Sequence, residues 1–200
     1  MELIVISSEV EVLNEIDDVN NLFINGLNLF HLRKSNTSEE IYKRFLKSID
    51  SKFHGRIVLH DHHQLLNEFG LKGIHLKEAK RKEIEKNLKS FKAGIGFLEK
   101  QHSISSSFHS KEAISGCSID FDYMFLSPVF DSISKDGYVG KRFDVSEIAS
   151  KTIALGGISE NNIHKAKKLG YRGVAVLGSI WKTQNPLSEF KKIQNICKST

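Results

Sequence analysis

The stretches ALGGIS (Ala154–Ser159) and GVAVLGSI (Gly173–Ile180) decide the fold that we predict for this sequence. Each is a short apolar run that stops at glycine and is closed by a small hydroxyl residue. Continuous apolar runs of this length are typical of parallel strands that are covered on both faces. We therefore predict two buried strands, each followed by glycine, which leaves the backbone there without side chains.

Six further apolar, β-branched runs come before these two, and all eight are separated by other segments. The six runs are Leu3–Ser7, Leu27–Arg33, Arg56–Asp61, Gly73–Leu76, Ser103–His109 and Tyr123–Phe130. Several of the separating segments have the spacing of amphipathic helices. Segment Ser38–Ile49 places Ile41, Phe45 and Ile49 on one face, and segment Ser159–Gly170 starts at a serine cap and stops at a glycine.

Eight strand candidates that alternate with helices predict right-handed crossovers and a parallel sheet. We expect a small (β/α)8 TIM barrel, an α/β fold, as a single domain over residues 1–200. Its weakest part is Lys77–Gln101, which has a long helical pattern. The alternative is an open, flavodoxin-like sheet, in which some of these runs would not be strands.

Composition limits the classes of function. The chain has 200 residues, 40% of them hydrophobic, and no apolar run near the roughly 20 residues that span a bilayer. Glu2 and the lack of an early basic segment argue against a signal peptide, and two cysteines are too few for a disulfide framework, so we expect a cytoplasmic protein. The net charge of +5 comes from lysines scattered over helical faces, which favours a site for a small anionic molecule over nucleic acid or membrane. A homodimer is one alternative for the oligomeric state.

The glycine endings predict a phosphate site. In barrels, the loops after strands seven and eight often bind phosphate through backbone N–H groups and a short helix N-terminus. Gly156 and Gly157 follow one of these runs, and Gly178 and Ser179 follow the other. Glycine lets backbone donors approach an anion without a Cβ in the way. The alternative is that these glycines only relieve crowding where a strand turns into a helix.

The other strand ends carry groups that suit a diphosphate held with Mg²⁺. Arg33 and Lys135 are cations, Ser132 and Ser134 supply hydroxyl groups, and Asp61 is a ligand for a hard cation. The run HDHH at residues 60–63 also raises the alternative of a zinc-dependent barrel metallohydrolase. Side chains alternate along an extended strand, so His60 and His62 would point away from Asp61, which disfavours that alternative. We expect His75 and His109 to be hydrogen-bonded core or rim residues.

The sequence resembles the thiamin phosphate synthase/TenI superfamily over nearly its whole length. The resemblance rests on seven stretches in family order: FHLRKSN, RIVLHDHHQLL, GIHL, SFHSKEAI, DYMFLSPVFDSISK, IALGGISENNI and GYRGVAVLGSIW. It implies a small (β/α)8 barrel that joins hydroxymethylpyrimidine diphosphate to thiazole phosphate and releases diphosphate. It assigns thiazole phosphate binding to Ser132, Ser134, Gly157, Leu177 and Gly178, together with the neighbouring Gly156 and Ser179. It assigns the pyrimidine diphosphate to Arg33, Lys135 and Ser107, and Mg²⁺ to Asp61. We expect His31 and His60, at the ends of neighbouring strands, to bind substrate as well.

The sequence also departs from that family. His31 stands where the synthases have glutamine, and His60 stands where they have asparagine. The second Mg²⁺ aspartate of the family falls at Lys80, which cannot bind the ion, although Glu78 is a possible substitute.

The eroded diphosphate half resembles the TenI branch, which includes a thiazole phosphate tautomerase. That enzyme uses a histidine where this chain has Pro128, so His109 or His31 would have to act as the base. The sequence thus leaves three alternatives: the synthase, the tautomerase and a non-catalytic thiazole phosphate-binding protein.

Overall fold

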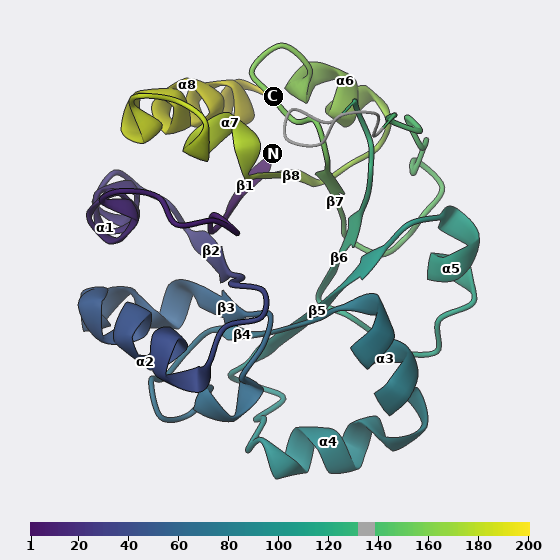
Figure 1. The fold of residues 1–200 in the computed structure, drawn as a ribbon. Helices are drawn as coiled ribbons and strands as arrows, with labels where there is room; N and C mark the ends of the chain where they lie inside the picture. Colours follow the sequence, from purple (N-terminus) through teal and green to yellow (C-terminus); the bar gives the residue numbers. More distant parts are fainter. Residues whose placement is uncertain (132–138) are drawn as a thin grey trace.

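A closed barrel of eight parallel strands forms the centre of the protein. The computed structural model describes residues 1–131 and 139–200. Strand order follows the chain, and β1 pairs with β8 to close the ring (Figure 1). The strands are β1 (Glu2–Ile6), β2 (Leu29–Leu32), β3 (Ile57–Leu59), β4 (Gly73–Leu76), β5 (Ser103–Phe108), β6 (Tyr123–Leu126), β7 (Thr152–Leu155) and β8 (Gly173–Val176). The predicted TIM barrel is confirmed, and the open sheet is excluded.

Helices surround the barrel on the outside (Figure 1). The α-helices are α1 (Glu15–Ile24), α2 (Glu39–Ser48), α3 (Glu78–Ile84), α4 (Leu88–Gly94), α5 (Lys111–Ser115), α6 (Ile163–Lys168), α7 (Gly178–Trp181) and α8 (Pro186–Ser199). The described residues also form three short 3-10 helices, η1 (Ser51–Arg56), η2 (His63–Leu65) and η3 (Glu85–Asn87). The long helical pattern after Leu76 is therefore two α-helices joined by η3. No helix in the described residues combines the length and apolarity needed to cross a membrane.

Two details of the predicted helices are wrong. Phe45 and Ile49 are buried as predicted, but Ile41 is 37% exposed, because the buried face of α2 includes Tyr42 and Leu46 and leaves Ile41 at its edge. Helix α6 starts after Asn162 and not at Ser159. The Asn162 side chain instead accepts a hydrogen bond from the Ser159 backbone N–H, so residues 159–162 form a turn ahead of the helix.

The core has two layers. The larger apolar layer lies between the strands and the helices, and a smaller one fills the inside of the barrel. The inner layer consists of Ile4, Ile6, Leu29, Val58, Tyr123, Phe125, Ile153 and Ala175. Polar side chains also point inward, and they include His31, His60, His75 and Ser105, which lie on or directly after β2 to β5. Because Ile6 and Phe125 reach a pocket at the same carboxyl end of the barrel, the interior near that end is polar on the side of β2 to β5 and mostly apolar on the side of β6 to β1.

Strands β7 and β8 bring the two glycine endings to the same end of the barrel. Leu155, the last residue of β7, is paired with Ala175, one residue before the end of β8. Because the two strands are parallel and in this register, Gly156–Gly157 and Leu177–Gly178 follow neighbouring strand ends. Trp181 fixes the segment after β8, since its indole N–H donates a buried hydrogen bond to the Ile6 carbonyl.

A pair of glycine substitutions tests the barrel register. A Cβ on Gly73 would lie 2.0 Å from the Ser103 carbonyl oxygen on β5, whereas a Cβ on Gly94 meets nothing within 4 Å. We expect Gly73→Ala to lower the free energy of unfolding by at least about 2 kcal/mol, because overpacking forces the backbone to shift. Gly94→Ala should leave the free energy unchanged or raise it by up to about 1 kcal/mol. Urea unfolding followed by circular dichroism measures both, and equal stabilities would contradict the β4–β5 packing.

Candidate functional site

A pocket of about 260 Å³ opens at the end of the barrel where the strands finish. Its lining comes from strands or strand ends around most of the ring: Ile6, Arg33, His60, His75, Lys77, Glu78, Ser107, His109, Phe125, Ser127 and Leu155. Four residues that we singled out from the sequence as site candidates, Arg33, His60, Ser107 and His109, are thus brought together. Ser132, Ser134 and Lys135 lie outside the described residues, so their assignments stay predictions.

Three buried histidines form a hydrogen-bonded network under this pocket. The Nδ1 atom of His31 lies 2.9 Å from Nε2 of His60, and its Nε2 atom lies 2.7 Å from the Tyr123 hydroxyl oxygen. His75 contacts the hydroxyl groups of Ser105 and Ser107, each at 2.8 Å. His60 and His75 reach the pocket, while His31 is fully buried below them. The network therefore joins the pocket floor to the barrel interior.

The three imidazoles are neutral at neutral pH. Burial lowers the pKa of His31 from its usual 6.5 to about 3. Burial, followed by the neighbouring histidines, holds the pKa values of His60 and His75 well below the usual range. Arg33 and Lys77 add to this effect at both residues. A neutral imidazole donates through one nitrogen and accepts through the other, so the floor offers both kinds of hydrogen bond to a ligand.

The same histidines are the residues that come nearest to a metal site in the described part of the chain. One nitrogen from each of His31, His60 and His75 lies within 4.8 Å of the others. However, the rings of His60 and His75 are stacked, with centroids 4.2 Å apart and planes only 23° from parallel. Nitrogen lone pairs lie in the ring plane, so these two rings do not aim at a common point. The arrangement fits a hydrogen-bonded network better than a preformed metal centre.

The run HDHH does not converge on one point. His62 has a positive φ and bonds to the Thr37 carbonyl oxygen, and His63 begins the short helix η2. Only His60 enters the barrel, because β3 ends at Leu59 and the chain then turns outward. The alternation of side chains along an extended strand does not apply to residues 61–63, because β3 ends at Leu59 and η2 begins at His63. The zinc ligand set that we weighed from this run is therefore not assembled.

Three cationic side chains that follow β2 and β4 in the described residues are each paired with an acid. Arg33 forms an ion pair with Glu9, and Lys34 forms one with the buried Glu15. Lys77, which the sequence did not single out, lies in the pocket lining and places its Nζ atom 2.7 Å from both carboxylate oxygens of Asp61. Asp61 also accepts a hydrogen bond from the Tyr42 hydroxyl at 3.3 Å.

The predicted second carboxylate does not join Asp61. Lys80, at the position of the family's second aspartate, pairs with Glu83, and Glu78 pairs with Lys82. Glu78 faces the pocket rim, where one of its oxygens lies 3.8 Å from Nε2 of His109. In the described residues, neither Asp61 nor Glu78 belongs to any group of three potential metal ligands. His109 also bonds to the Ser127 carbonyl oxygen, which makes it the rim residue that we expected.

The segment after β8 offers donors that have no acceptor in the described structure. The N–H groups of Ile180 and Trp181 both donate to the Leu177 carbonyl, but no described hydrogen bond uses those of Gly178 or Ser179. The Ser179 hydroxyl oxygen is buried and has no hydrogen-bond partner in the described residues. An unpartnered buried donor is costly, so these three groups are suited to an anion.

The glycines after β7 meet a stricter requirement. Gly156 and Gly157 have φ values of +96° and +64°, in the left-handed region that other residues rarely adopt. A Cβ on Gly157 would lie 2.1 Å from the Asp131 carbonyl oxygen. Backbone conformation and close packing therefore demand glycine here, whether or not a ligand binds. Two hypotheses from the sequence, that these glycines relieve crowding and that they bind phosphate, are both compatible with this geometry.

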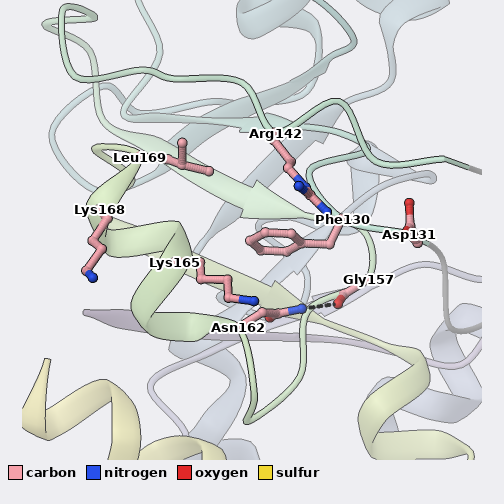
Figure 2. Close-up of a pocket in the computed structure, with 8 residues that line it drawn as sticks. All are labelled: Phe130, Asp131, Arg142, Gly157, Asn162, Lys165, Lys168 and Leu169. Carbon is pink, nitrogen blue, oxygen red and sulfur yellow. Dashed lines mark hydrogen bonds between the residues drawn. The ribbon is translucent and has the colours of Figure 1, made fainter.

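A second, larger groove of about 500 Å³ lies beside α6 and the segment after β6 (Figure 2). Two of its lining residues are joined, because the Asn162 side chain donates a hydrogen bond to the Gly157 carbonyl oxygen at 2.7 Å. Arg142, Lys165 and Lys168 make its lining basic. Because Gly157 is part of this lining, the loop after β7 faces both the groove and the neighbourhood of the mouth.

Comparison with known proteins identifies the family. The family model described as thiamine monophosphate synthase matches residues 3–180. The chain belongs to the thiamine monophosphate synthase family. The resemblance read from the sequence is therefore confirmed at the level of the family.

Related proteins align with nearly the whole length of this member of the thiamine monophosphate synthase family. The thiamine-phosphate synthase of Caldicellulosiruptor saccharolyticus is 26% identical over 92% of this chain and 85% of its own length. The thiamine-phosphate synthase of Dictyoglomus turgidum is also 26% identical, over 90% of this chain and 82% of its own length. The solved thiamine phosphate pyrophosphorylase from Bacteroides thetaiotaomicron is 31% identical, with a TM-score of 0.75 and coverage of 99% and 98%. The one from Pyrococcus furiosus has a TM-score of 0.77 at 19% identity, which supports the fold alone.

The buried network predicts a stability that depends on pH. Below pH 6.5 the unfolded chain binds a proton at each histidine, whereas folded His31 stays neutral until about pH 3. Stability is therefore lost as the pH falls through this window. We expect His31→Gln to reduce that loss by about 1.4 kcal/mol per pH unit between about pH 6 and pH 4. Urea unfolding at a series of pH values measures the slope, and identical slopes for the two proteins would show that His31 is not held neutral.

Proposed function

We propose that this protein is a thiamine-phosphate synthase, which joins hydroxymethylpyrimidine diphosphate to thiazole phosphate and releases diphosphate. Membership in the family supports this class of reaction. The observation that carries the proposal is one barrel end that holds two kinds of anion-binding group. Backbone donors without a described acceptor follow β8, and the cationic side chains of Arg33 and Lys77 follow β2 and β4. The ligands that this assignment implies are phosphorylated small molecules, in a cytoplasmic enzyme.

The thiazole phosphate would bind at the ends of β7 and β8. The N–H groups of Gly178 and Ser179 and the buried Ser179 hydroxyl are its donors, and Leu177 lies against the apolar core beside them. Backbone donors are fixed in place before the ligand arrives, so they hold the phosphate with little loss of entropy. Gly157, Ser132 and Ser134 complete this half of the site by resemblance to the family.

The pyrimidine diphosphate would bind in the pocket over the histidine floor. Arg33 and Lys77 line the pocket and neutralise negative charge, and Lys135 joins them by resemblance. Ser107 and His60, which contact the pocket, supply hydrogen-bonding groups for the pyrimidine, while His31 orients His60 from below. Loss of diphosphate leaves a stabilised pyrimidinylmethyl cation, so the protein's work is to neutralise the leaving group and to aim the thiazole nitrogen at the carbon.

A Mg²⁺ ion at Asp61 does not fit the described residues. Mg²⁺ needs a near-octahedral set of oxygen ligands, usually with one or two carboxylates. Both oxygens of Asp61 are already bonded to the Lys77 ammonium group, and Lys80 stands at the expected second carboxylate. We therefore route no step of the proposed reaction through the metal.

A TenI-like tautomerase is the second candidate, and His109 is the observation that favours it. Its ring lies at the pocket rim, half exposed, where a base could reach a ligand held after β8. Pro128 occupies the position at which the tautomerase has its histidine. Isomerisation of the thiazole tautomer by the purified protein alone would support this candidate, and binding without turnover would support a non-catalytic thiazole phosphate-binding protein.

Gly178→Asp tests the phosphate end of the site. A carboxylate at this position would occupy the anion's space and repel it, so we expect thiazole phosphate binding to be lost. Ser179→Ala removes one neutral donor and keeps the backbone N–H groups, so it should weaken binding by about 10-fold. Gly55→Asp is the control, because a Cβ there meets nothing within 4 Å and Gly55 precedes β3 at the opposite end of the barrel. Calorimetric titration measures all three, and normal binding by Gly178→Asp would make these donors merely structural.

The synthase reaction itself is tested with both substrates and mass detection of thiamine phosphate. We expect product, and we expect Arg33→Ala to weaken pyrimidine diphosphate binding by about 1.5–3 kcal/mol, the contribution of a hydrogen bond to a charged group. Arg44→Ala, on the exposed face of α2, is the matched control. No product from the parent protein, or unchanged binding by Arg33→Ala, would contradict the assignment.

A further inference from the structure

We propose that Lys77 takes the place of a divalent cation in this protein, so that its ammonium group, oriented by Asp61, binds the diphosphate without Mg²⁺. This inference rests on the proposed function, because it concerns the diphosphate half of the same site. Lys77 is the first residue after β4, and Asp61 lies two residues beyond the end of β3. These strands pair in parallel, with Leu59 opposite Ile74, so the barrel register itself brings the two side chains together.

The ion pair is well defined. The Lys77 Nζ atom lies 2.7 Å from each Asp61 oxygen, and one of those oxygens accepts the Tyr42 hydroxyl at 3.3 Å. Tyr42 is fully buried and in turn accepts the Lys34 backbone N–H, so the carboxylate is held from behind by a fixed group. Asp61 is therefore a positioning residue, whose described partners hold it toward Lys77.

The ammonium group keeps capacity for a ligand. An ammonium has three donors, and two of them account for the contacts to Asp61. In the described residues Lys77 makes no hydrogen bond to any other acceptor, and its side chain is 41% exposed. Since Lys77 lines the pocket, the third N–H is available to a phosphate oxygen there.

The surrounding charges disfavour a metal ion at this place. A dication at Asp61 would sit beside the Lys77 ammonium, and like charges in the mouth repel. Arg33 lines the same pocket, and its guanidinium group, although it is paired with Glu9, places a second cation near Asp61's partner Lys77. Lys80 and Glu78, the two residues at or near the family's second aspartate, are each bound to a partner of opposite charge on α3. Fixed side-chain cations thus supply the charge that a metal would otherwise bring.

The test uses inorganic diphosphate as the probe and isothermal titration calorimetry as the readout. The whole protein is titrated in buffer with excess EDTA and again with Mg²⁺. We expect the parent protein to bind diphosphate in EDTA, Lys77→Ala to lose about 10- to 100-fold in that affinity, and Lys77→Arg to retain most of it. Lys52→Ala is the matched control, since Lys52 forms an equivalent pair with Asp50 at 2.6 Å on η1, away from the mouth.

Three results would overturn the inference: diphosphate binding that appears only with Mg²⁺, no binding in either buffer, or a Lys77→Ala variant that binds as the parent does in EDTA. Circular dichroism melting shows that each variant is folded. Thiamine phosphate formation in the same two buffers separates this inference from the proposed function. Product that forms only with Mg²⁺ would keep the function and reject the role of Lys77. Binding in EDTA without any product would keep the role of Lys77 and reject the synthase.

Discussion

Pairing of β1 with β8 is the contact on which the functional end of this molecule depends. Four residues of β1, from Glu2 to Val5, pair with Gly173–Val176, and this closes the sheet into a barrel. All eight strands are parallel and therefore end on the same side, and closure arranges these ends in one ring, so groups that are far apart in the chain meet there. The Trp181 indole on the Ile6 carbonyl reinforces this closure and fixes the segment that offers free backbone donors.

The inside of the barrel divides into an apolar half and a polar half, and this division sets the chemistry of the pocket floor. Three neutral histidines form hydrogen bonds with one another or with Tyr123, Ser105 and Ser107 at the floor of the pocket. Burial makes a charged imidazole costly, so the histidines add no positive charge to a mouth that already holds Arg33 and Lys77. The pocket floor can therefore form hydrogen bonds with a polar ring, while the cationic side chains at the mouth can neutralise negative charge on a ligand.

Acidic partners hold the cations of the mouth in place. Arg33 with Glu9, Lys34 with Glu15 and Lys77 with Asp61 all lie at the carboxyl ends of the first four strands. Each acid lowers the net charge but fixes a long side chain that would otherwise lose conformational freedom when a ligand binds. Donors that are already ordered are the physical basis of the metal-free diphosphate binding that we propose.

The sequence by itself determined the barrel, because eight apolar runs separated by helical segments leave few other ways to bury both faces of a parallel sheet. It also placed Arg33, His60, Ser107 and His109 at one end, since each follows or ends a strand. Only the tertiary structure brought Lys77 to Asp61, because the two residues are 16 positions apart in the chain and the register of β3 and β4 joins them. The tertiary structure alone also brought His31, His60 and His75 together, because the orientation of each strand in the closed barrel decides which of its side chains point inward.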